Sequence, residues 1–369
     1  MNRAARGFVL PLTIWILVAV AVVAAYLAER VQKSLRLAQS RQQASEVQVD
    51  ISNARAELLF RLATQGMSPC GLGVGPQCVA LDGRPYQLGA TILQLQDARG
   101  LLNLSRTSDA QIDSLLAQYG VQPDARPRLI DALRDYADAD SLKRLNGAEA
   151  ADYAARQQPP PRNAPLRTAL ELRAVLGWAE APLWGVALGA DPAPDAVDPT
   201  ASARPPPIDQ LVTVGSNVAI NPNTAPPEVL RTLPGMTAEL AWAVVERRRL
   251  EPVDVSLLDR LVGGGLTQMP PLVIAFPGTE LQVTQSAPGL AGGLRYNLSL
   301  TPRGATAPWE VLSFYRTEAA AAPLARASRD TTVALNAAPP ADKASDVPRF
   351  PPRTILPAAP AGLSGLREP

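Results

Sequence analysis

The most constraining feature of the sequence is an uncharged, apolar run near its start. It extends for 21 residues, from Phe8 to Ala28, behind a leader whose only charged side chains are Arg3 and Arg6. About 20 apolar residues in a helix span the hydrocarbon core of a bilayer, whereas the apolar part of a cleaved signal peptide has about 7–15 residues. The run therefore predicts one membrane-spanning helix over residues 8–28, and the basic leader favours a cytoplasmic N-terminus.

The same helix is expected to continue well beyond the membrane. From Glu29 to about Gln65 the sequence contains no glycine and no proline. Apolar residues recur in this segment at spacings of three and four, which places them on one helix face: Val31, Leu35, Ala38, Val47, Ile51, Ala54, Leu58 and Leu62. Gly66 and Pro69 then supply the stop. The alternative is an ordinary anchor joined to a coiled stalk.

The beginning of the chain resembles the type IV pilins and pseudopilins. The resembling features are a short basic leader that ends in Gly7, then Phe8, then a long apolar helix with Pro11 at the fourth position after the glycine. The resemblance implies that a prepilin peptidase cuts between Gly7 and Phe8 and methylates the new N-terminal Phe8. Most members carry glutamate at the fifth mature position, whereas this chain has Leu12. A plain, unprocessed anchor is the alternative.

Composition argues against an enzyme. The chain has no histidine, which excludes a Ser/His/Asp hydrolase and removes the commonest nitrogen ligand of transition metals. No glycine-rich phosphate loop and no nucleophile in a recognised turn occurs in the sequence. The net charge of +1 gives no general attraction to nucleic acid. We therefore assign no catalytic residue and expect a structural protein.

The only two cysteines, Cys70 and Cys78, lie in the glycine- and proline-rich stretch MSPCGLGVGPQC. Residues this close in a loop can reach disulfide distance, and a disulfide is expected if the domain lies outside the cytosol. The alternative is a pair of free thiols. A zinc site would need more soft ligands than the chain offers.

The rest of the chain divides into strand-like and helix-like segments. Alternating and β-branched residues predict two short strands within 85–105 and three more after Pro270. Apolar spacings of three and four predict helices over 109–119, 127–136 and 166–178. The low-complexity stretch 190–207 is expected to form a flexible loop.

The stretch INPNTAPPEVLRTLPGMTAELAWAVVERRR, residues 220–249, predicts a helix-hairpin-helix. Asn223-Thr224 is expected to cap the first helix, Pro234-Gly235 to end it, and Thr237 to begin a second helix that runs through Arg249. The stretch is similar to the signature of membrane-anchored competence DNA receptors, which makes DNA binding the alternative function. The turn lacks the second glycine of that signature, and glutamates lie among the arginines, so nucleic acid is not the expected partner.

The order of several motifs along the chain resembles the type II secretion minor pseudopilin K, the GspK family. These motifs are DARGLLNL from Asp97, DYADAD from Asp135, GAE from Gly147, Tyr153 with the proline-rich turn after it, ELRAV from Glu171, and INPNTAP from Ile220. The resemblance implies an α+β, pilin-like fold whose antiparallel sheet is interrupted by a large helical, helix-hairpin-helix or SAM-like domain. The implied segments are a leader (1–7), a transmembrane part (8–28), the outer half of the helix with the first strands (29–105), the inserted domain (106–270), the remaining strands (271–316) and a disordered tail (317–369).

The resemblance also implies a function. A protein of this family is a minor pseudopilin at the tip of the type II secretion pseudopilus, where it initiates assembly and supports protein export across the outer membrane. Its partners would be the I- and J-type minor pseudopilins, the major pseudopilin and the prepilin peptidase. It would sit in the bacterial inner membrane with most of the chain in the periplasm. Leu12 agrees with a tip position, because it cannot pair with the terminal ammonium of a subunit above.

A group of acidic residues in the middle of the chain is a candidate calcium site. Calcium prefers oxygen ligands such as carboxylates, and some pseudopilins, including relatives of this family, bind it. The candidate ligands are Asp135, Asp138, Asp140, Glu149 and Asp152. Their spacing does not match an EF-hand loop, and the alternative is a helix end followed by a solvated acidic loop.

Overall fold

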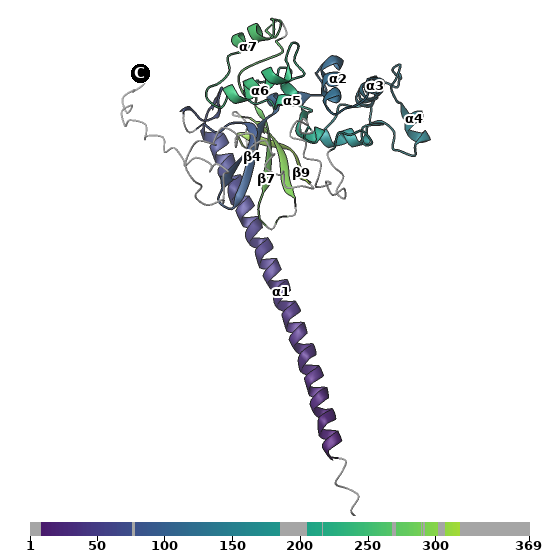
Figure 1. The fold of residues 1–369 in the computed structure, drawn as a ribbon, viewed down its shortest axis with the longest axis vertical. Helices are drawn as coiled ribbons and strands as arrows, with labels where there is room; N and C mark the ends of the chain where they lie inside the picture. Colours follow the sequence, from purple (N-terminus) through teal and green to yellow (C-terminus); the bar gives the residue numbers. More distant parts are fainter. Residues whose placement is uncertain are drawn as a thin grey trace, which may run out of the picture.

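The chain folds as an α+β protein, as its sequence predicts (Figure 1). The computed structural model describes residues 9–317, with gaps at 76–77, 185–204, 216, 268–270, 289, 291 and 302–306. The predicted leader with its Gly7–Phe8 bond, most of the predicted 190–207 loop and residues 318–369 of the predicted tail lie outside the described residues.

A single helix, α1, runs from Val9 to Thr64 and has 56 residues. At about 1.5 Å per residue such a helix is roughly 84 Å long, and Figure 1 shows its N-terminal part extending away from the rest of the molecule. From Thr13 onward α1 is long and apolar enough to cross a membrane, and none of its most apolar window is buried within the protein. The continuous helix predicted from the absence of glycine and proline is therefore confirmed.

The C-terminal part of α1 packs on a five-stranded antiparallel sheet. The sheet order is β3-β4-β7-β8-β9, with the bounds β3 (Asp82–Leu88), β4 (Thr91–Asp97), β7 (Glu280–Ser286), β8 (Gly293–Leu300) and β9 (Trp309–Thr317). Because β4 and β7 are hydrogen-bonded neighbours, the chain leaves the sheet after Asp97 and returns to its adjacent position at Glu280. Everything between these two residues is an insertion between neighbouring strands.

Two separate hydrophobic cores follow from this topology. The smaller core lies between α1 and the sheet, and it includes Leu58 and Leu62 of the helix with Leu93, Val283 and Tyr296 of the strands. These residues alternate along their strands, as they should when one face of a sheet is covered. The larger core is formed by the insertion itself, and its residues run from Leu102 to Val273.

The insertion is built from short helices joined by turns. Its helices are α2 (Asp109–Gln118), α3 (Arg126–Ala137), α4 (Ala150–Ala155), α5 (Pro227–Leu230), α6 (Ala238–Arg247) and α7 (Val255–Leu261), and its 3₁₀ turns are η2 (Ala98–Gly100), η3 (Ala169–Ala174) and η4 (Ile208–Gln210). Ser108 begins α2 through a reciprocal capping box with Gln111. A two-residue parallel pair, β5 (Leu102–Asn103) with β6 (Val212–Thr213), joins the start of the insertion to its later part.

Two predictions about local structure were wrong. The helix predicted over 166–178 is only the short 3₁₀ turn η3. The buried residues of the segment recur at every third position, as in Ala169, Leu172 and Val175, which is the period of a 3₁₀ turn and not that of an α-helix. The helix expected to start at Asn223-Thr224 starts at Pro227, after the cap residue Pro226. Residues that precede a proline avoid helical backbone angles, so the Pro226-Pro227 pair delays the helix.

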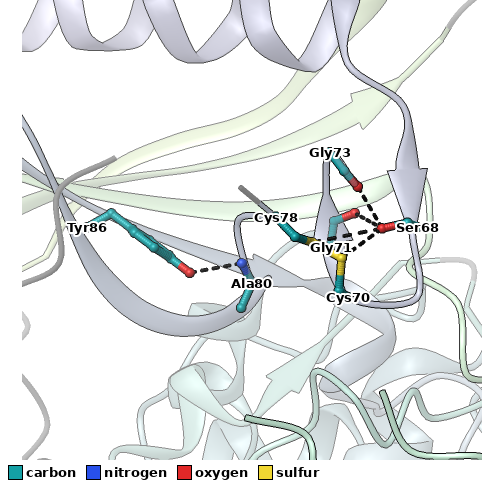
Figure 2. Close-up of a disulfide and its surroundings, with 7 residues drawn as sticks. All are labelled: Ser68, Cys70, Gly71, Gly73, Cys78, Ala80 and Tyr86. Atoms are coloured by element: carbon teal, nitrogen blue, oxygen red, sulfur yellow. Dashed lines mark hydrogen bonds between the residues drawn. A yellow bond between two sulfur atoms is a disulfide. The ribbon is translucent and has the colours of Figure 1, made fainter. Parts of the chain in front are cut away.

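The two cysteines lie beside the end of α1, next to the small pair β1 (Met67–Ser68) and β2 (Gly71–Leu72). Cys70 and Cys78 are joined by a disulfide with their Cα atoms 6.2 Å apart. Figure 2 shows the Ser68 hydroxyl inside this loop, where it donates to the Gly73 carbonyl at 2.7 Å. In the same view the Tyr86 hydroxyl of β3 accepts from the Ala80 amide at 2.9 Å, which ties the loop to the sheet.

Candidate functional site

A buried carboxylate fixes the point at which the chain leaves the sheet and returns to it. Asp97, at the end of β4, has no exposed surface. Its Oδ1 accepts from the Arg99 and Gly278 amides, each at 3.0 Å. Its Oδ2 accepts from Asn221 Nδ2 and Thr224 Oγ1, each at 3.0 Å. Burial raises the pKa of Asp97, and these four hydrogen bonds act in the opposite direction.

This junction brings together two of the motifs that carry the family resemblance. DARG supplies Asp97, and INPNTAP supplies Asn221 and Thr224, which are more than 120 residues away in the sequence. The backbones also approach closely, since a Cβ on Gly100 would lie 2.7 Å from the Thr224 carbonyl oxygen. Thr224 therefore acts in this joint, whereas the Asn223 side chain accepts from the Val253 amide at 2.6 Å and donates to the Val253 carbonyl, so neither residue caps a helix.

Two buried ion pairs add to this joint. Arg248, at the end of α6, reaches Asp82 of β3 at 3.3 Å, and both side chains are less than 10% exposed. Arg295 of β8 reaches Asp209 of η4 at 2.8 Å. Burial by itself would raise the pKa of Asp82, but the hydrogen bond from Arg84 and the charges of Arg248 and Arg84 outweigh it and lower this pKa to about 2. The insertion is thus attached to the sheet through charged side chains at two further points.

The arginines of the predicted hairpin are engaged within the protein. Arg247 pairs with Glu251, and Arg249 pairs with Glu246 at 3.2 Å. Arg248 donates to the Pro222 and Ala225 carbonyls in addition to Asp82. The turn at Gly235 has a positive φ of 72° and lies against Val262. These arrangements serve packing, and none of the three guanidinium groups is set apart as a phosphate contact.

The structure brings four of the five predicted calcium ligands together. Asp135 lies in α3, Asp138 follows its end, Asp140 lies in the loop beyond, and Glu149 precedes α4. This acidic cluster lies in the part of the insertion that is farthest from α1 (Figure 1). The pKa of Asp138 is raised first by burial and then by the charges of Asp140 and Asp135. The pKa of Glu149 is raised by burial and by Asp135, Asp138 and Asp140.

Several oxygens in the cluster have no hydrogen-bond donor. Asp138 Oδ1 and Glu149 Oε1 are buried and have no hydrogen-bond partner. Glu149 is only 8% exposed, so little solvent is available to replace the missing donor. A buried carboxylate oxygen without a donor is costly, so these atoms fit the oxygen donors that calcium prefers. Among the described residues, however, no group of three acidic or cysteine side chains forms a ready-made metal site. A cation would therefore have to draw the ligands inward.

The fifth predicted ligand, Asp152, is placed differently. Its Oδ1 accepts from Lys143 Nζ at 2.7 Å, and its Oδ2 accepts from the Glu149 amide at 2.9 Å. These two bonds lower its pKa. Asp152 thus has a complete set of partners as the first-turn acid of α4, and its oxygens are less available to a metal.

Two residues of this region were missed by sequence reasoning. Asn163 Nδ2 donates to the Asp140 carbonyl at 2.5 Å, and its Oδ1 is a further buried oxygen without a donor. Arg144 is the second of these residues, with its Nε 3.6 Å from Asp135 Oδ1. A search for acidic residues alone could not find either, although the basic pair Lys143-Arg144 between the acids was a visible signal.

The comparisons with known proteins identify part of the insertion. Residues 92–184 match the family model for type II secretion system (T2SS), protein K. No curated protein matches the chain. A chain of the crystal structure of the GspK-GspI-GspJ complex from the enterotoxigenic Escherichia coli Type 2 Secretion System is 16% identical, with a TM-score of 0.45, over 79% of this chain and 100% of that chain. The matched segment holds β4, the Asp97 junction and the acidic cluster. Residues 92–184 of this chain are a domain of the type II secretion system protein K family.

Proposed function

We propose that the chain is a K-type minor pseudopilin of a type II secretion system, located at the tip of the pseudopilus. The observation that carries the proposal is the protein K domain at residues 92–184, joined through the sheet to one continuous helix with an apolar first half. A structural subunit accounts for the absence of histidine and for buried polar groups that hold elements together. In this role the protein initiates assembly and supports export without catalysing a reaction.

The anchor and its orientation follow from α1. Large apolar side chains such as Trp15, Leu17 and Val22 are more than 60% exposed, which suits lipid or the helices of neighbouring subunits. Arg3 and Arg6 before the run favour a cytoplasmic N-terminus. The folded part would then lie in the periplasm, an oxidising compartment that agrees with the Cys70–Cys78 disulfide.

The tip position is supported by Leu12 and by the size of the insertion. A filament of packed apolar helices would bury the N-terminal ammonium of each processed subunit, and burying that charge alone is expensive. Leu12 offers no carboxylate to the N-terminal ammonium of a subunit above it. The first subunit of the filament has no subunit above it, so it needs no such carboxylate. The insertion between Asp97 and Glu280 also extends beyond the sheet on the side of α2, α3 and α4 (Figure 1), where it would obstruct a tightly wound shaft but not an end.

The experiment for the tip position is gold labelling of assembled pseudopili in a strain that makes this protein with its I-, J- and major-type partners. Label at one end of the filament supports the proposal. Label along the shaft of wild-type filaments refutes it. Leu12→Glu tests the reason, because the added acid should allow some label to enter the shaft. A Leu12→Gln variant, which is polar but uncharged, is the matched control and should leave the label at the end.

We further propose that the acidic cluster binds calcium. The unpartnered oxygens of Asp138 and Glu149 favour this over a solvated loop, and the amide oxygen of Asn163 is a further candidate ligand. When bound, calcium would supply positive charge that joins the end of α3 to the start of α4. Calorimetric titration of the detergent-solubilised chain should show binding that Glu149→Gln removes and that Asp113→Asn, an exposed control in α2, leaves unchanged. Absence of heat in the wild-type protein would contradict the proposal.

A further inference from the structure

We propose that Arg144 is an internal counter-ion of the acidic cluster and that a divalent cation must compete with it for the same carboxylates. The inference rests on the proposed calcium binding, and it adds that the charge of Arg144 sets the affinity of the cluster for calcium. It concerns the loop between α3 and α4, which carries the sequence Leu142-Lys143-Arg144-Leu145. The two leucines are 77% and 94% exposed, whereas the two basic residues between them turn towards acidic groups. The loop thus presents its charges to the protein and its apolar side chains to solvent.

Arg144 is held against the most buried carboxylate of the cluster. Its backbone amide donates to Asp135 Oδ2 at 3.2 Å, and its Nε lies 3.6 Å from Asp135 Oδ1. Asp135 has no exposed surface, and a Cβ on Gly147 would collide with its carboxylate, so the loop closes directly over this group. The Asp135–guanidinium distance is longer than a hydrogen bond, and the Arg144 side chain is 47% exposed. The Arg144 guanidinium is close enough to offset the negative charge of Asp135, and it is exposed enough for a metal ion to displace it.

The cluster has more negative charge than this one arginine can offset. Besides burial, like-charge repulsion from Asp140 and Asp135 raises the pKa of Asp138, and repulsion from all three aspartates raises the pKa of Glu149. Arg144 is the basic residue whose charge lowers the pKa values of both Asp135 and Asp138. The unpartnered oxygens of Asp138 and Glu149 remain beside it. A divalent cation would satisfy these oxygens better than the guanidinium does, but it would first meet the positive charge of Arg144.

Lys143 provides a matched control next to Arg144 in the chain. Both side chains are 47% exposed, and both are basic. Lys143 pairs with Asp152, whose other oxygen accepts from the Glu149 amide, and it lowers the pKa of Asp152. Removing the charge of Lys143 changes the net charge of the protein equally. Asp152 then still accepts from the Glu149 amide at the start of α4, so the four-carboxylate cluster itself is not exposed.

The test is calorimetric titration of calcium chloride into the full-length, detergent-solubilised protein and its Arg144→Gln, Lys143→Gln and Glu149→Gln variants. We expect Arg144→Gln to bind calcium about three- to tenfold more tightly than the wild type, which is the size of a partly exposed charge interaction. Lys143→Gln should bind within about twofold of the wild type, because an exposed charge outside the cluster contributes little. Equal or weaker binding in Arg144→Gln overturns the inference while leaving calcium binding intact.

A second measurement decides the inference independently of calcium. In excess EDTA, Arg144→Gln should lower the melting temperature, and adding Asp138→Asn should restore part of the loss because it removes one repelling charge. The same addition to Lys143→Gln should restore nothing. If neither the wild type nor any variant binds calcium, the calcium proposal fails. The melting temperatures in EDTA then still test whether Arg144 offsets the charge of the cluster. Failure of Asp138→Asn to rescue Arg144→Gln would overturn the counter-ion role.

Discussion

Replacing Asp97 with alanine should destabilise the protein strongly, because it removes the shared acceptor at the junction between the sheet and the insertion. The carboxylate accepts four hydrogen bonds, from the Arg99 and Gly278 amides and from the Asn221 and Thr224 side chains. The Thr224 hydroxyl has a second acceptor in the Asn221 carbonyl at 3.4 Å, so three donors would lose their partner. Each buried donor left unpaired costs about 1–3 kcal/mol.

The expected net loss is smaller than the sum of these terms. Alanine also removes a buried negative charge, whose cost is reflected in the raised pKa of Asp97. We therefore expect Asp97→Ala to reduce the free energy of unfolding by about 3–5 kcal/mol, which is the lower part of the range that three unpaired buried donors would give at about 1–3 kcal/mol each. Asp97→Asn keeps the shape and one acceptor oxygen, but its NH₂ group faces two donors, so its loss should be intermediate.

The assay is urea denaturation of the detergent-solubilised chain, followed by tryptophan fluorescence. Trp178 is fully buried in the insertion core and reports on that part. The control is Asp113→Asn, which breaks the ion pair with Arg126 at 3.2 Å but leaves no buried donor. Exposed pairs contribute about 0–1 kcal/mol. A loss below about 1 kcal/mol for Asp97→Ala, no larger than this control, would refute the claim that Asp97 joins the insertion to the sheet.

Other outcomes can be predicted from single contacts. Non-reducing peptide mapping should recover Cys70 linked to Cys78, and Cys70→Ser should cost about 2–3 kcal/mol by the loop-entropy model; complete alkylation of both thiols in periplasm-folded protein would contradict the bond. Because the pKa of Asp82 is lowered to about 2, the ionised carboxylate stabilises the folded protein at neutral pH, and this stabilisation should be lost as the pH falls from about 4 towards 2. If Asp82→Asn leaves the loss of stability between about pH 4 and about pH 2 unchanged, the Asp82–Arg248 ion pair is not its cause. Mass spectrometry of membrane-extracted protein should give N-methyl-Phe8 as its first residue, and an N-terminus at Met1 would favour a plain anchor. Gel-shift affinity for DNA should be no tighter than the non-specific range of about 10⁻⁴–10⁻⁶ M, and tighter binding would support the alternative function.

The elements that sequence predicted well are those with long, regular patterns. Helix α1 was predictable because neither glycine nor proline interrupts the segment 29–65 and one face repeats at spacings of three and four. Helices α2 and α3 lie within a residue or so of their predicted bounds for the same reason, and α2 has a capping box that fixes its start. The three strands predicted after Pro270 are present as β7, β8 and β9, but β8 buries four successive residues, because its other face is also partly covered, as the buried Arg295 that pairs with Asp209 of the insertion shows.

The elements that sequence reasoning missed depend on contacts between distant residues. The parallel pair β5–β6 has two residues in each strand and joins Leu102 to Val212, so no local pattern marks it. Asn163 became a candidate ligand only through its contact with Asp140. The cluster was predicted from acidic composition, but composition could not separate Asp152, which Lys143 neutralises, from Glu149, which retains a donorless oxygen.

The position of the family motifs in the fold bears on the proposed function. DARG and INPNTAP meet at Asp97, where they fix the insertion to the sheet on which α1 packs. The ion pairs Asp82–Arg248 and Arg295–Asp209 hold the same two parts at separate places. Three points that do not lie on one element restrict rotation as well as separation, so the insertion has a defined orientation relative to α1. A filament subunit needs this property, because force and position pass from the membrane helix to whatever the insertion contacts. Two of the motifs that carry the family resemblance therefore hold the insertion in place, and under the proposed calcium binding the acidic cluster at its far end would be the part that responds to a ligand.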